Sequence, residues 1–240
     1  MDRFYVTGEH RLGSEVRFSP AQGRQITRVL RRGAGSRLLT FNGSGREWEV
    51  EILATPSRQV VGRVVAERRP QSESPLRVVL LQGVLKGAKM DYLIQKVTEM
   101  GVAEVVLVST RRTVAEGGGK VGRWSRIAIE AAEQSGRLRV PRLTGPRPLE
   151  TCVSGSRRGT AVVLWEGEEV GTFAALLDRV PPANEVTILV GPEGGLETDE
   201  VALLGKAGFV PASLGPRTLR AETAAVAAMA ILQHRWGDLR

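Results

Sequence analysis

The most constraining feature of this sequence is the stretch from residue 186 to residue 223. Residues 186–190 form a continuous apolar run that breaks into Gly191-Pro192-Glu193-Gly194-Gly195. A second short apolar run ends at Leu214-Gly215-Pro216 and leads into a helix that begins near residue 221. Continuous apolar runs are typical of buried parallel strands, and ligands of open α/β sheets bind at the carboxyl ends of such strands. The two glycine-bearing loops are therefore expected to form two walls of one pocket.

The first of these loops lacks the chemistry of a phosphate cradle. Such a cradle needs backbone N–H groups and positive charge, whereas this loop carries an acid, Glu193, at its centre. The dinucleotide fingerprint G-x-G-x-x-G is absent, and residues 83–89 fail the spacing of a triphosphate-binding loop because their sixth position is Ala88. A ligand with adenosine-like faces and a cationic tail fits the loop. The alternative is a tight turn that binds nothing.

Length and composition narrow the class of protein. The 240 residues suffice for one large domain or two modest ones, and a hydrophobic content of 42% fits a soluble globular chain. The apolar run at residues 224–232 is too short to span a membrane, and the first residues do not resemble a signal peptide. With one cysteine, Cys152, and two histidines, His10 and His234, neither an internal disulfide nor a metal site is expected. We therefore expect a cytoplasmic protein without a membrane partner.

Positive charge is concentrated near the amino terminus. The net charge is +8, and residues 1–75 carry 13 Lys and Arg against 8 Asp and Glu. Read as a helix, residues 20–30 place Ile26, Val29 and Leu30 on one face and arginines on another. Arginines that are neither paired nor buried indicate a polyanion, most plausibly RNA, although a merely solvated basic face is the alternative. Between residues 16 and 46 there is no acid but there are seven arginines, Arg17, Arg24, Arg28, Arg31, Arg32, Arg37 and Arg46.

The chain divides near residues 68–75, which contain two prolines and no apolar periodicity and therefore read as a linker. Before it, short strand candidates surround the one helix, which suggests a small β-barrel. After it, strands and helices alternate, which predicts an α/β domain with a mainly parallel sheet. The strand candidates are residues 4–6, 37–41, 47–53, 60–65, 78–81, 105–108, 161–164 and 186–190. The later helices are expected at about residues 90–100, 124–135, 172–177 and 199–207.

At this point the motifs resemble a known family. Residues 191–195, followed by Leu214-Gly215-Pro216-Arg217-Thr218-Leu219-Arg220-Ala221-Glu222-Thr223-Ala224, are similar to the signature of the bacterial 16S rRNA uridine-N3 methyltransferases, which belong to the SPOUT superfamily and use S-adenosylmethionine. The resemblance covers essentially the whole chain. Met100 stands where leucine is usual, and neither it nor Ala221 touches the expected chemistry. Upstream matches are Lys96, Glu99, Gly101, Arg112, Lys120, Arg123, Trp124, Glu130, Ala131, Gln134, Ser135, Arg137 and Pro141.

The resemblance implies a fold and a cofactor site. It implies a PUA-like β-barrel that binds RNA at residues 1–70 and a SPOUT methyltransferase domain at residues 76–240. A trefoil knot is implied at about residues 160–225, which composition alone would not suggest because knots are rare. Three knot segments would bind S-adenosylmethionine, with Glu166 and Glu193 holding ribose hydroxyls or favouring the sulfonium charge. The residues assigned to the cofactor are Leu164, Glu166, Gly191, Glu193, Gly194, Gly195, Leu214, Gly215 and Leu219.

The expected reaction is methyl transfer to N3 of a uridine. Arg217 and Arg220 flank the cofactor loop and are candidates to stabilise charge on the uracil oxygens, unless they pair with Glu193 or Glu222. Glu222 is the candidate for accepting the proton or orienting the base. The RNA contacts are expected to be Arg24, Arg28, Arg31, Arg32, Arg112 and Arg123.

The apolar helix at residues 224–232 carries small side chains on nearly every face. Internal packing against the sheet would explain this pattern, whereas the resemblance favours a homodimer interface beside the pocket.

Two other functions compete with the uridine-N3 reaction on 16S rRNA or the small subunit. One is a SPOUT ribose 2'-O-methyltransferase, which the helix start Arg220-Ala221-Glu222-Thr223 argues against. The other is a non-catalytic RNA-binding factor for ribosome assembly, for which the basic barrel would suffice.

Overall fold

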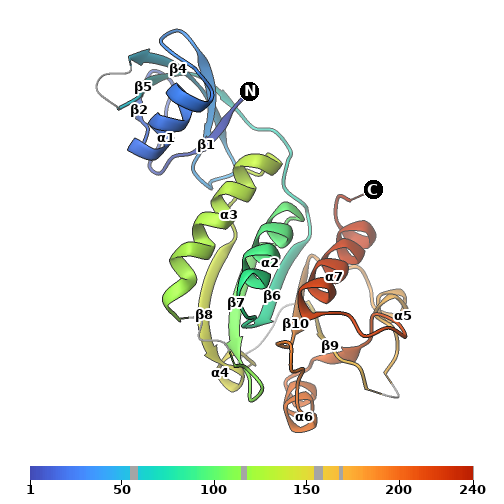
Figure 1. The fold of residues 1–240 in the computed structure, drawn as a ribbon. Coiled ribbons are helices and arrows are strands. Elements are labelled where there is room, and N and C mark those ends of the chain that lie inside the picture. Colours follow the sequence, from blue (N-terminus) through green and yellow to red (C-terminus); the bar gives the residue numbers. More distant parts are fainter. Residues whose placement is uncertain (55–58, 115–117, 154–158, 168–169, 240) are drawn as a thin grey trace. The chain divides into compact units, whose positions relative to one another are not determined.

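The computed structural model describes residues 1–240 except 55–58, 115–117, 154–158, 168–169 and 240, and it divides into two compact units (Figure 1). The first unit comprises Met1–Glu73 together with Ala132–Val140. The second comprises Ser74–Ala131 together with Pro141–Arg240. In the described ranges no helix has the length and apolar character needed to cross a membrane.

The first unit is built on a five-stranded curled sheet in the order β1-β3-β4-β5-β2. β1 and β3 are parallel and the other pairs are antiparallel. Alternate residues of the strands point into one apolar core that holds Phe4, Val16, Leu38, Trp48 and Val50. The elements are β1 (Arg3–Tyr5), β2 (Glu15–Arg17), α1 (Pro20–Arg24), a π-helical turn η1 (Gln25–Val29), β3 (Arg37–Phe41), β4 (Glu47–Ala54) and β5 (Val61–Arg68).

The helix of the first unit changes type halfway. Ser19 and Gln22 form a capping box at its start, with a proline at the first helical position. From residue 25 the chain widens into the π-helical turn, so the side chains no longer follow the 3.6-residue period. Ile26 is buried as expected, but the prediction that Val29 shares its buried face is wrong, because Val29 is 72% exposed. Two residues beyond the turn, Arg31 has a positive φ of 53°.

Acids of β4 neutralise several arginines that sequence alone left unpaired. Glu47 and Glu49 are buried on the face of β4 opposite the core. Glu47 pairs with Arg3, while Glu49 pairs with Arg37 and Arg68. The hydrogen bond from Arg37 lowers the pKa of Glu49 although burial opposes it, and the charge of Arg68 adds to the effect.

The expectation that the seven arginines of residues 16–46 lack partners is therefore wrong for four of them. Three of the four partners are distant in the sequence, and the fourth, Glu15, lies just outside the acid-free segment. The four pairs are Arg17 with Glu15, Arg32 with Asp2, Arg37 with Glu49, and Arg46 with Glu67.

A segment from later in the chain completes the first unit. Phe41, Ala132 and Leu138 form a second small core, with Tyr5 against it. The Glu73 carboxylate accepts hydrogen bonds from the Arg137 guanidinium at 2.8 Å and from the backbone N–H groups of Leu138 at 2.8 Å and Arg139 at 2.9 Å. Residues 132–140 are therefore held by both apolar packing and a partly buried ion pair.

The second unit is a six-stranded sheet in the order β11-β9-β10-β6-β7-β8, and every strand pair is parallel. The expected α/β class with a mainly parallel sheet is confirmed. β8 was not expected from the sequence, because it holds two prolines and a glycine and lies at the sheet edge, where prolines are tolerated. The strands are β6 (Arg77–Gly83), β7 (Glu104–Ser109), β8 (Arg142–Pro148), β9 (Thr160–Leu164), β10 (Glu185–Val190) and β11 (Val210–Ala212).

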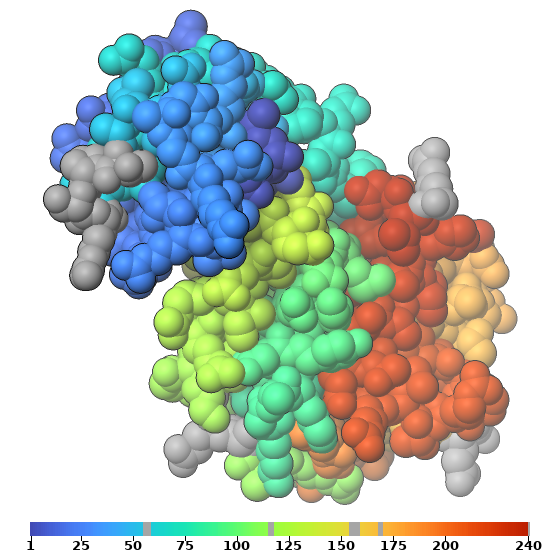
Figure 2. Space-filling view, turned by 45° about the horizontal axis from the view of Figure 1, so that its top comes forward, coloured from blue at the N-terminus to red at the C-terminus, as the bar shows by residue number. Residues whose placement is uncertain are grey.

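Helices cover both faces of this sheet. α2 and α7 pack against each other, and Figure 2 shows α7 in red beside α2 in green at the surface. The opposite face packs an apolar core that includes Leu81, Val163, Leu189 and Phe209. The helices are α2 (Ala88–Glu99), the short η3 (Gly118–Lys120), α3 (Val121–Ser135), α4 (Leu149–Val153), α5 (Phe173–Arg179), α6 (Thr198–Lys206) and α7 (Ala221–Trp236).

Candidate cofactor and substrate site

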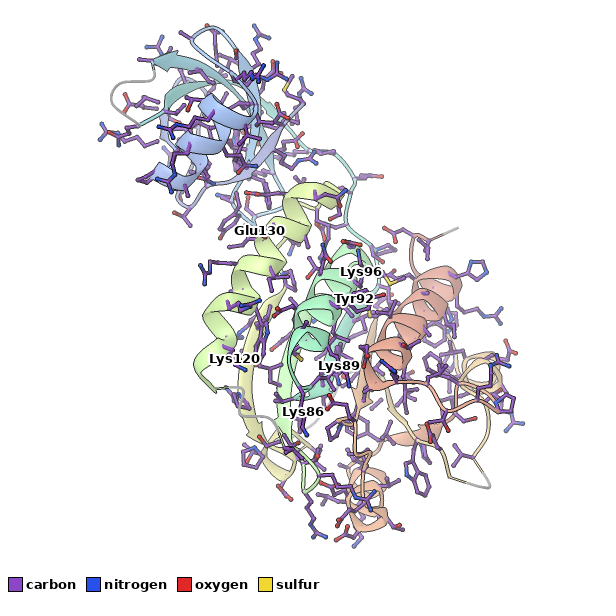
Figure 3. The ribbon with its side chains drawn as sticks, viewed as in Figure 1. Lys86, Lys89, Tyr92, Lys96, Lys120 and Glu130 are labelled. Carbon is purple, nitrogen blue, oxygen red and sulfur yellow. The ribbon has the colours of Figure 1, made fainter. Side chains whose placement is uncertain are left out.

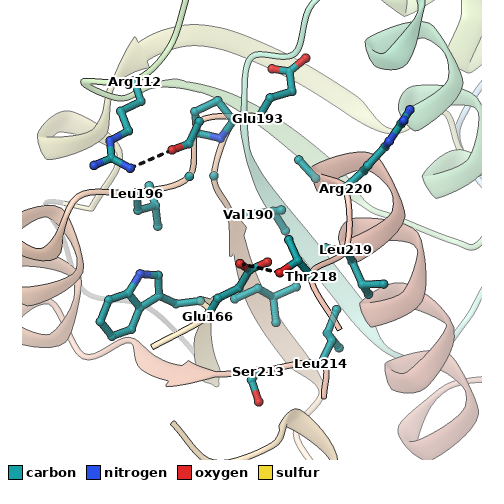
Figure 4. Close-up of a pocket in the computed structure, with 18 of the residues that line it drawn as sticks. Arg112, Glu166, Val190, Glu193, Leu196, Ser213, Leu214, Thr218, Leu219 and Arg220 are labelled. Carbon is teal, nitrogen blue, oxygen red and sulfur yellow. Dashed lines mark hydrogen bonds between the residues drawn. The ribbon is translucent and has the colours of Figure 1, made fainter. Parts of the chain in front are cut away.

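Three loops at the carboxyl ends of β9, β10 and β11 surround a cavity of about 690 Å³ in the second unit (Figure 4). The three strands are neighbours in the sheet, so their ends meet at one edge. Gly83, at the end of the adjacent strand β6, lets the backbone of Gly191 and Pro192 pass close by, because a Cβ there would collide with both. The two glycine-bearing loops do form two walls of one pocket, as the sequence predicted.

The loop after β10 is a tight turn with most of its polar groups in use. The N–H of Gly195 donates to the carbonyl of Pro192 at 2.9 Å, and the carbonyl of Gly191 accepts from the buried side-chain amide of Gln82 at 3.3 Å. Gly195 has φ of +73°, a conformation that favours glycine, and a Cβ there would meet no atom within 4 Å. The turn is therefore held on the side of β6 by Gln82, and the space beside Gly195 is open to a ligand.

Glu193 is tied to the start of α2. Its Oε1 accepts from the backbone N–H of Lys86 at 3.0 Å and from Nζ of Lys89 at 3.1 Å; Lys86 just precedes that helix and Lys89 lies in its first turn (Figure 3). Burial alone would raise the pKa of Glu193, but the hydrogen bonds from the backbone and from Lys89 lower it on balance. Oε1 of Glu193 therefore already has two donors. This favours a role in holding the loop to α2 over a role in binding ribose hydroxyls.

Glu166 has the opposite character. It is exposed, it lines the cavity, and its Oε2 accepts one hydrogen bond, from the hydroxyl of Thr218 at 3.3 Å (Figure 4). An ionised carboxylate can accept several more. Of the two acids assigned to the cofactor, Glu166 is the one with acceptor capacity facing the cavity.

The apolar part of the wall comes from the expected strand ends and from residues that sequence reasoning missed. Leu164, Leu214 and Leu219 line the cavity as predicted, as do Gly191, Gly194, Gly195 and Gly215. Trp165, Thr218, Lys89 and Leu196 also line it and were not predicted. The signal for Trp165 was available, because it follows the apolar run of β9 directly and therefore stands at a strand's carboxyl end.

Two arginines at the cavity carry uncompensated charge. Arg217 and Arg220 are exposed and line the cavity, and neither has an acidic partner in the described part of the chain. The alternative that they pair with Glu193 or Glu222 therefore has no support. The third expected catalytic residue, Glu222, does not line the cavity. It is 8% exposed on the buried face of α7, where its Oε2 has no hydrogen-bond partner among the described residues.

The expected RNA contacts fall into two groups. Arg24, Arg28 and Arg31 are exposed and make no ion pair with any residue that the structure describes. The others are engaged within the protein: Arg32 with Asp2 at 3.2 Å, Arg123 with Asp91 at 2.6 Å, and Arg112 with the carbonyl of Gly194 at 3.0 Å. No group of three or more His, Cys, Asp or Glu in the described ranges could hold a metal ion.

The parallel sheet and the cavity at its edge define an α/β ligand-binding unit, and comparison with known proteins gives its family. Residues 72–233 match the model of the RNA methyltransferase domain. The chain is 31% identical over 225 residues to the ribosomal RNA small subunit methyltransferase E of Bacillus subtilis, covering 90% of this chain and 88% of that one. The chain therefore belongs to the RNA methyltransferase family and, within it, to the group of ribosomal RNA small subunit methyltransferase E.

Solved structures agree over the full length. The ribosomal RNA small subunit methyltransferase E of Neisseria gonorrhoeae, bound to S-adenosyl methionine, superimposes with a TM-score of 0.92 at 29% identity and covers 100% of both chains. A methyltransferase of Legionella pneumophila in complex with the same cofactor gives a TM-score of 0.91 at 34% identity over 99% of both chains. These likenesses confirm the expected α/β fold class with a separate amino-terminal β-domain, and the trefoil knot stays a prediction.

Proposed function

We propose that this protein transfers the methyl group of S-adenosylmethionine to N3 of a uridine in the 16S rRNA of the small ribosomal subunit. The observation that carries the proposal is the charge at the cavity. A cofactor with a sulfonium centre gains nothing from nearby cations, yet Arg217 and Arg220 line the cavity without acidic partners. Their charge suits a second, anionic substrate that shares the cavity with the cofactor.

The residues present fit the cofactor. Leu164, Leu214 and Leu219 offer an apolar slot for a flat base, Glu166 offers acceptor oxygens for ribose hydroxyls, and Gly195 leaves open space where a side chain would intrude. When bound, S-adenosylmethionine supplies an activated methyl group. The remaining cofactor residues, Gly191, Gly194 and Gly215, let the backbone approach it closely.

The catalytic contribution of the chain is to position and to stabilise charge. Holding the uracil edge against the cofactor replaces a bimolecular encounter with a fixed approach. N3 must lose its proton, which passes to solvent, and charge then develops on the two uracil oxygens, which the planar guanidinium of Arg217 or Arg220 can stabilise. Because Glu222 is buried outside the cavity, we assign it an indirect role in orienting the start of α7, where Arg220 is the cap residue.

The first unit would supply RNA affinity. Arg24 and Arg28 lie in one short helical segment, Arg31 follows its end, and none of the three has an acidic partner in the described chain, so the proposed polyanion contact rests on them. Arg31 adopts a left-handed conformation that costs a non-glycine residue free energy, and such conformations concentrate at functional sites. We propose that this stripe binds rRNA phosphates.

Assembly and topology complete the proposal. The face of α7 formed by Ala227, Ala230 and Ile231 is only half-buried, which suits the homodimer interface expected from the sequence.

The trefoil knot at about residues 160–225 remains a prediction, supported by the order β11-β9-β10, which brings the three expected knot segments together. A protein that methylates 16S rRNA would act in the cytoplasm.

A product analysis tests the function. The protein is incubated with unmethylated small-subunit rRNA, and separately with small subunits, and S-adenosylmethionine carrying a labelled methyl group. Nuclease digestion and mass spectrometry should then find N3-methyluridine. A methyl group on the ribose would instead establish the 2'-O-methyltransferase alternative. Binding of rRNA with no methylation and no affinity for S-adenosylhomocysteine would establish the assembly-factor alternative.

A further inference from the structure

The turn after β7 is an unusually constrained piece of surface. Within residues 110–113, the backbone N–H of Thr110 donates to the Thr113 hydroxyl at 2.8 Å, and the two hydroxyls lie 3.0 Å apart. The N–H of Thr113 returns to the carbonyl of Thr110 at 3.0 Å. Thr110 and Thr113 therefore restrain each other, and the backbone of the two central residues, Arg111 and Arg112, has a fixed orientation.

This turn is also fastened to the start of α6. The backbone N–H of Arg111 donates to Oε1 of Glu200 at 3.0 Å, and Glu200 is 4% exposed. The second oxygen of Glu200 accepts from the N–H of Glu197 at 2.8 Å. The guanidinium of Arg111 pairs with both Glu197 and Asp199. The buried carboxylate and the exposed pairs together hold the turn in one position relative to α6.

The held turn places Arg112 across the cofactor loop. Nη1 of Arg112 donates to the carbonyl of Gly194 at 3.0 Å (Figure 4), and its Nε lies 3.6 Å from Oε1 of Glu197. The fit is close, because a Cβ on Gly194 would come within 3.0 Å of the Cβ of Arg112. In the described chain no other group donates to this carbonyl.

The bond matters because of the two adjacent glycines. Gly194 and Gly195 have no Cβ, so the peptide between them can rotate at little steric cost. The rest of the loop is held at other points, by Gln82 at Gly191 and by Lys86 and Lys89 at Glu193. The N–H of the same peptide, on Gly195, donates to the carbonyl of Pro192 at 2.9 Å, so Arg112 supplies one of the two hydrogen bonds that fix the plane of this peptide. Without Arg112 the Pro192 bond alone opposes rotation, and a rotated peptide would change the polar groups at the cavity wall.

We infer that Arg112 is a positioning residue for the cofactor loop: its hydrogen bond to the Gly194 carbonyl holds the Gly194–Gly195 peptide in the orientation that receives the cofactor. The inference rests on the proposed function and differs from the expectation that Arg112 contacts RNA. Its consequence is that the charge of Arg112 serves cofactor affinity before any rRNA is present.

The test compares Arg112→Ala, Arg112→Lys and the control Arg126→Ala. Arg126 is exposed on α3 and has no ion pair with any described residue, so its loss removes the same charge without touching the loop. In calorimetric titration without RNA, Arg112→Ala should weaken S-adenosylhomocysteine binding about tenfold, because it removes a partly exposed hydrogen bond from a charged group. Arg112→Lys should fall between the parent and Arg112→Ala, and Arg126→Ala should match the parent.

Two further measurements separate positioning from other roles. Hydrogen–deuterium exchange of the free protein should be faster in Arg112→Ala at residues 191–196 and unchanged at β6 and β10, with the same thermal midpoint as the parent. The salt dependence of binding to a small-subunit rRNA fragment should be unchanged. If Arg112→Ala does not fold, Arg112→Met keeps an aliphatic side chain over Gly194 but has no donor for its carbonyl, and it should weaken S-adenosylhomocysteine binding in the same way.

Unchanged cofactor affinity and exchange, with a salt slope lower by about one unit, would overturn the inference and make Arg112 a phosphate ligand. Failure of the proposed function looks different. In that case the parent protein itself would not bind S-adenosylhomocysteine, whatever residue stands at position 112.

Discussion

The hydroxyl of Thr218 donates to Oε2 of Glu166 across 3.3 Å, and this bond joins the loop that leaves β9 to the loop that precedes α7. The two residues are 52 positions apart in the sequence, and both line the cavity. The bond orients the carboxylate that we assign to the ribose. It also links two walls of the cavity that have no other described side-chain bond to each other.

Replacing Thr218 by valine tests this link. Valine keeps the shape and removes the donor, so affinity for S-adenosylhomocysteine should fall about three- to tenfold, in line with roughly 1 kcal/mol for one hydrogen bond. Thr223→Val is the matched control, because Thr223 is exposed and does not line the cavity. Calorimetry that gives both variants the affinity of the parent would show that Glu166 needs no orientation.

Gly195→Val should abolish cofactor binding in a folded protein. The side chain would enter open space at the cavity, and the positive φ of +73° would cost it on the order of 1–2 kcal/mol of stability. Gly205→Ala, in the last turn of α6 with free space around it, should bind normally. Circular dichroism checks the fold and calorimetry the affinity. A folded Gly195→Val protein with undiminished affinity would remove this loop from the site.

The arginine stripe predicts a change in salt dependence. Arg24→Ala together with Arg28→Ala should weaken rRNA binding and lower the slope of log affinity against log salt by roughly 0.7–0.9 for each phosphate that the protein no longer neutralises. The control, Arg11→Ala with Arg17→Ala, removes the same charge from arginines that already pair with Glu9 and Glu15. Filter binding at several salt concentrations measures both slopes. Equal slopes for the two double variants would mean that net charge alone governs binding.

The proposed dimer predicts a specific sensitivity of α7. Ala227→Arg, on the half-buried stripe, should convert a dimer into a monomer in analytical ultracentrifugation and reduce turnover. Ala202→Arg, on the exposed side of α6, should remain dimeric. Ala228 is unsuitable for this test because it is fully buried, so an arginine there would disturb the fold. A parent protein that sediments as an active monomer would contradict the interface.

Acidification should release the clamp at Glu193. Its pKa is lowered in the folded protein, so the stability that it contributes is present above the ordinary glutamate pKa, about 4.3, and is lost as pH falls through the lower folded value. The difference in unfolding free energy between the parent and Glu193→Gln should therefore shrink below about pH 4.3. Urea titrations at a series of pH values measure it. A difference that is independent of pH would show that the Lys89 contact contributes no stability.

Much of the second unit could be predicted from sequence because its strands are local patterns. The apolar runs at β9 and β10 and the glycines after them mark strands and their ends wherever the strands lie in the sheet. By contrast, β2 has only three residues and β8 is interrupted by prolines, so neither carries a pattern that sets it apart from a loop.

The site was harder to predict where partners come from distant segments. The glycines and leucines of the cavity follow from strand ends, but whether a charged residue is free depends on what folds against it. Glu193 is engaged by Lys89 from α2, and Arg37 by Glu49 from the next strand, while Arg217 and Arg220 stay unpaired among the described residues. Local sequence gives the charge of each residue, but it does not show which oppositely charged residue lies next to it in the folded protein.

The segment at residues 132–140 has a consequence for how this architecture can be taken apart. Because Leu138 and Arg137 complete the first unit, a fragment ending at Glu73 would expose Phe41 and leave the Glu73 carboxylate without its guanidinium. Residues 1–73 alone are thus not a complete, transferable domain. A graft onto another protein must carry the distant segment with it, and a recombination point at the linker would separate residues that fold together.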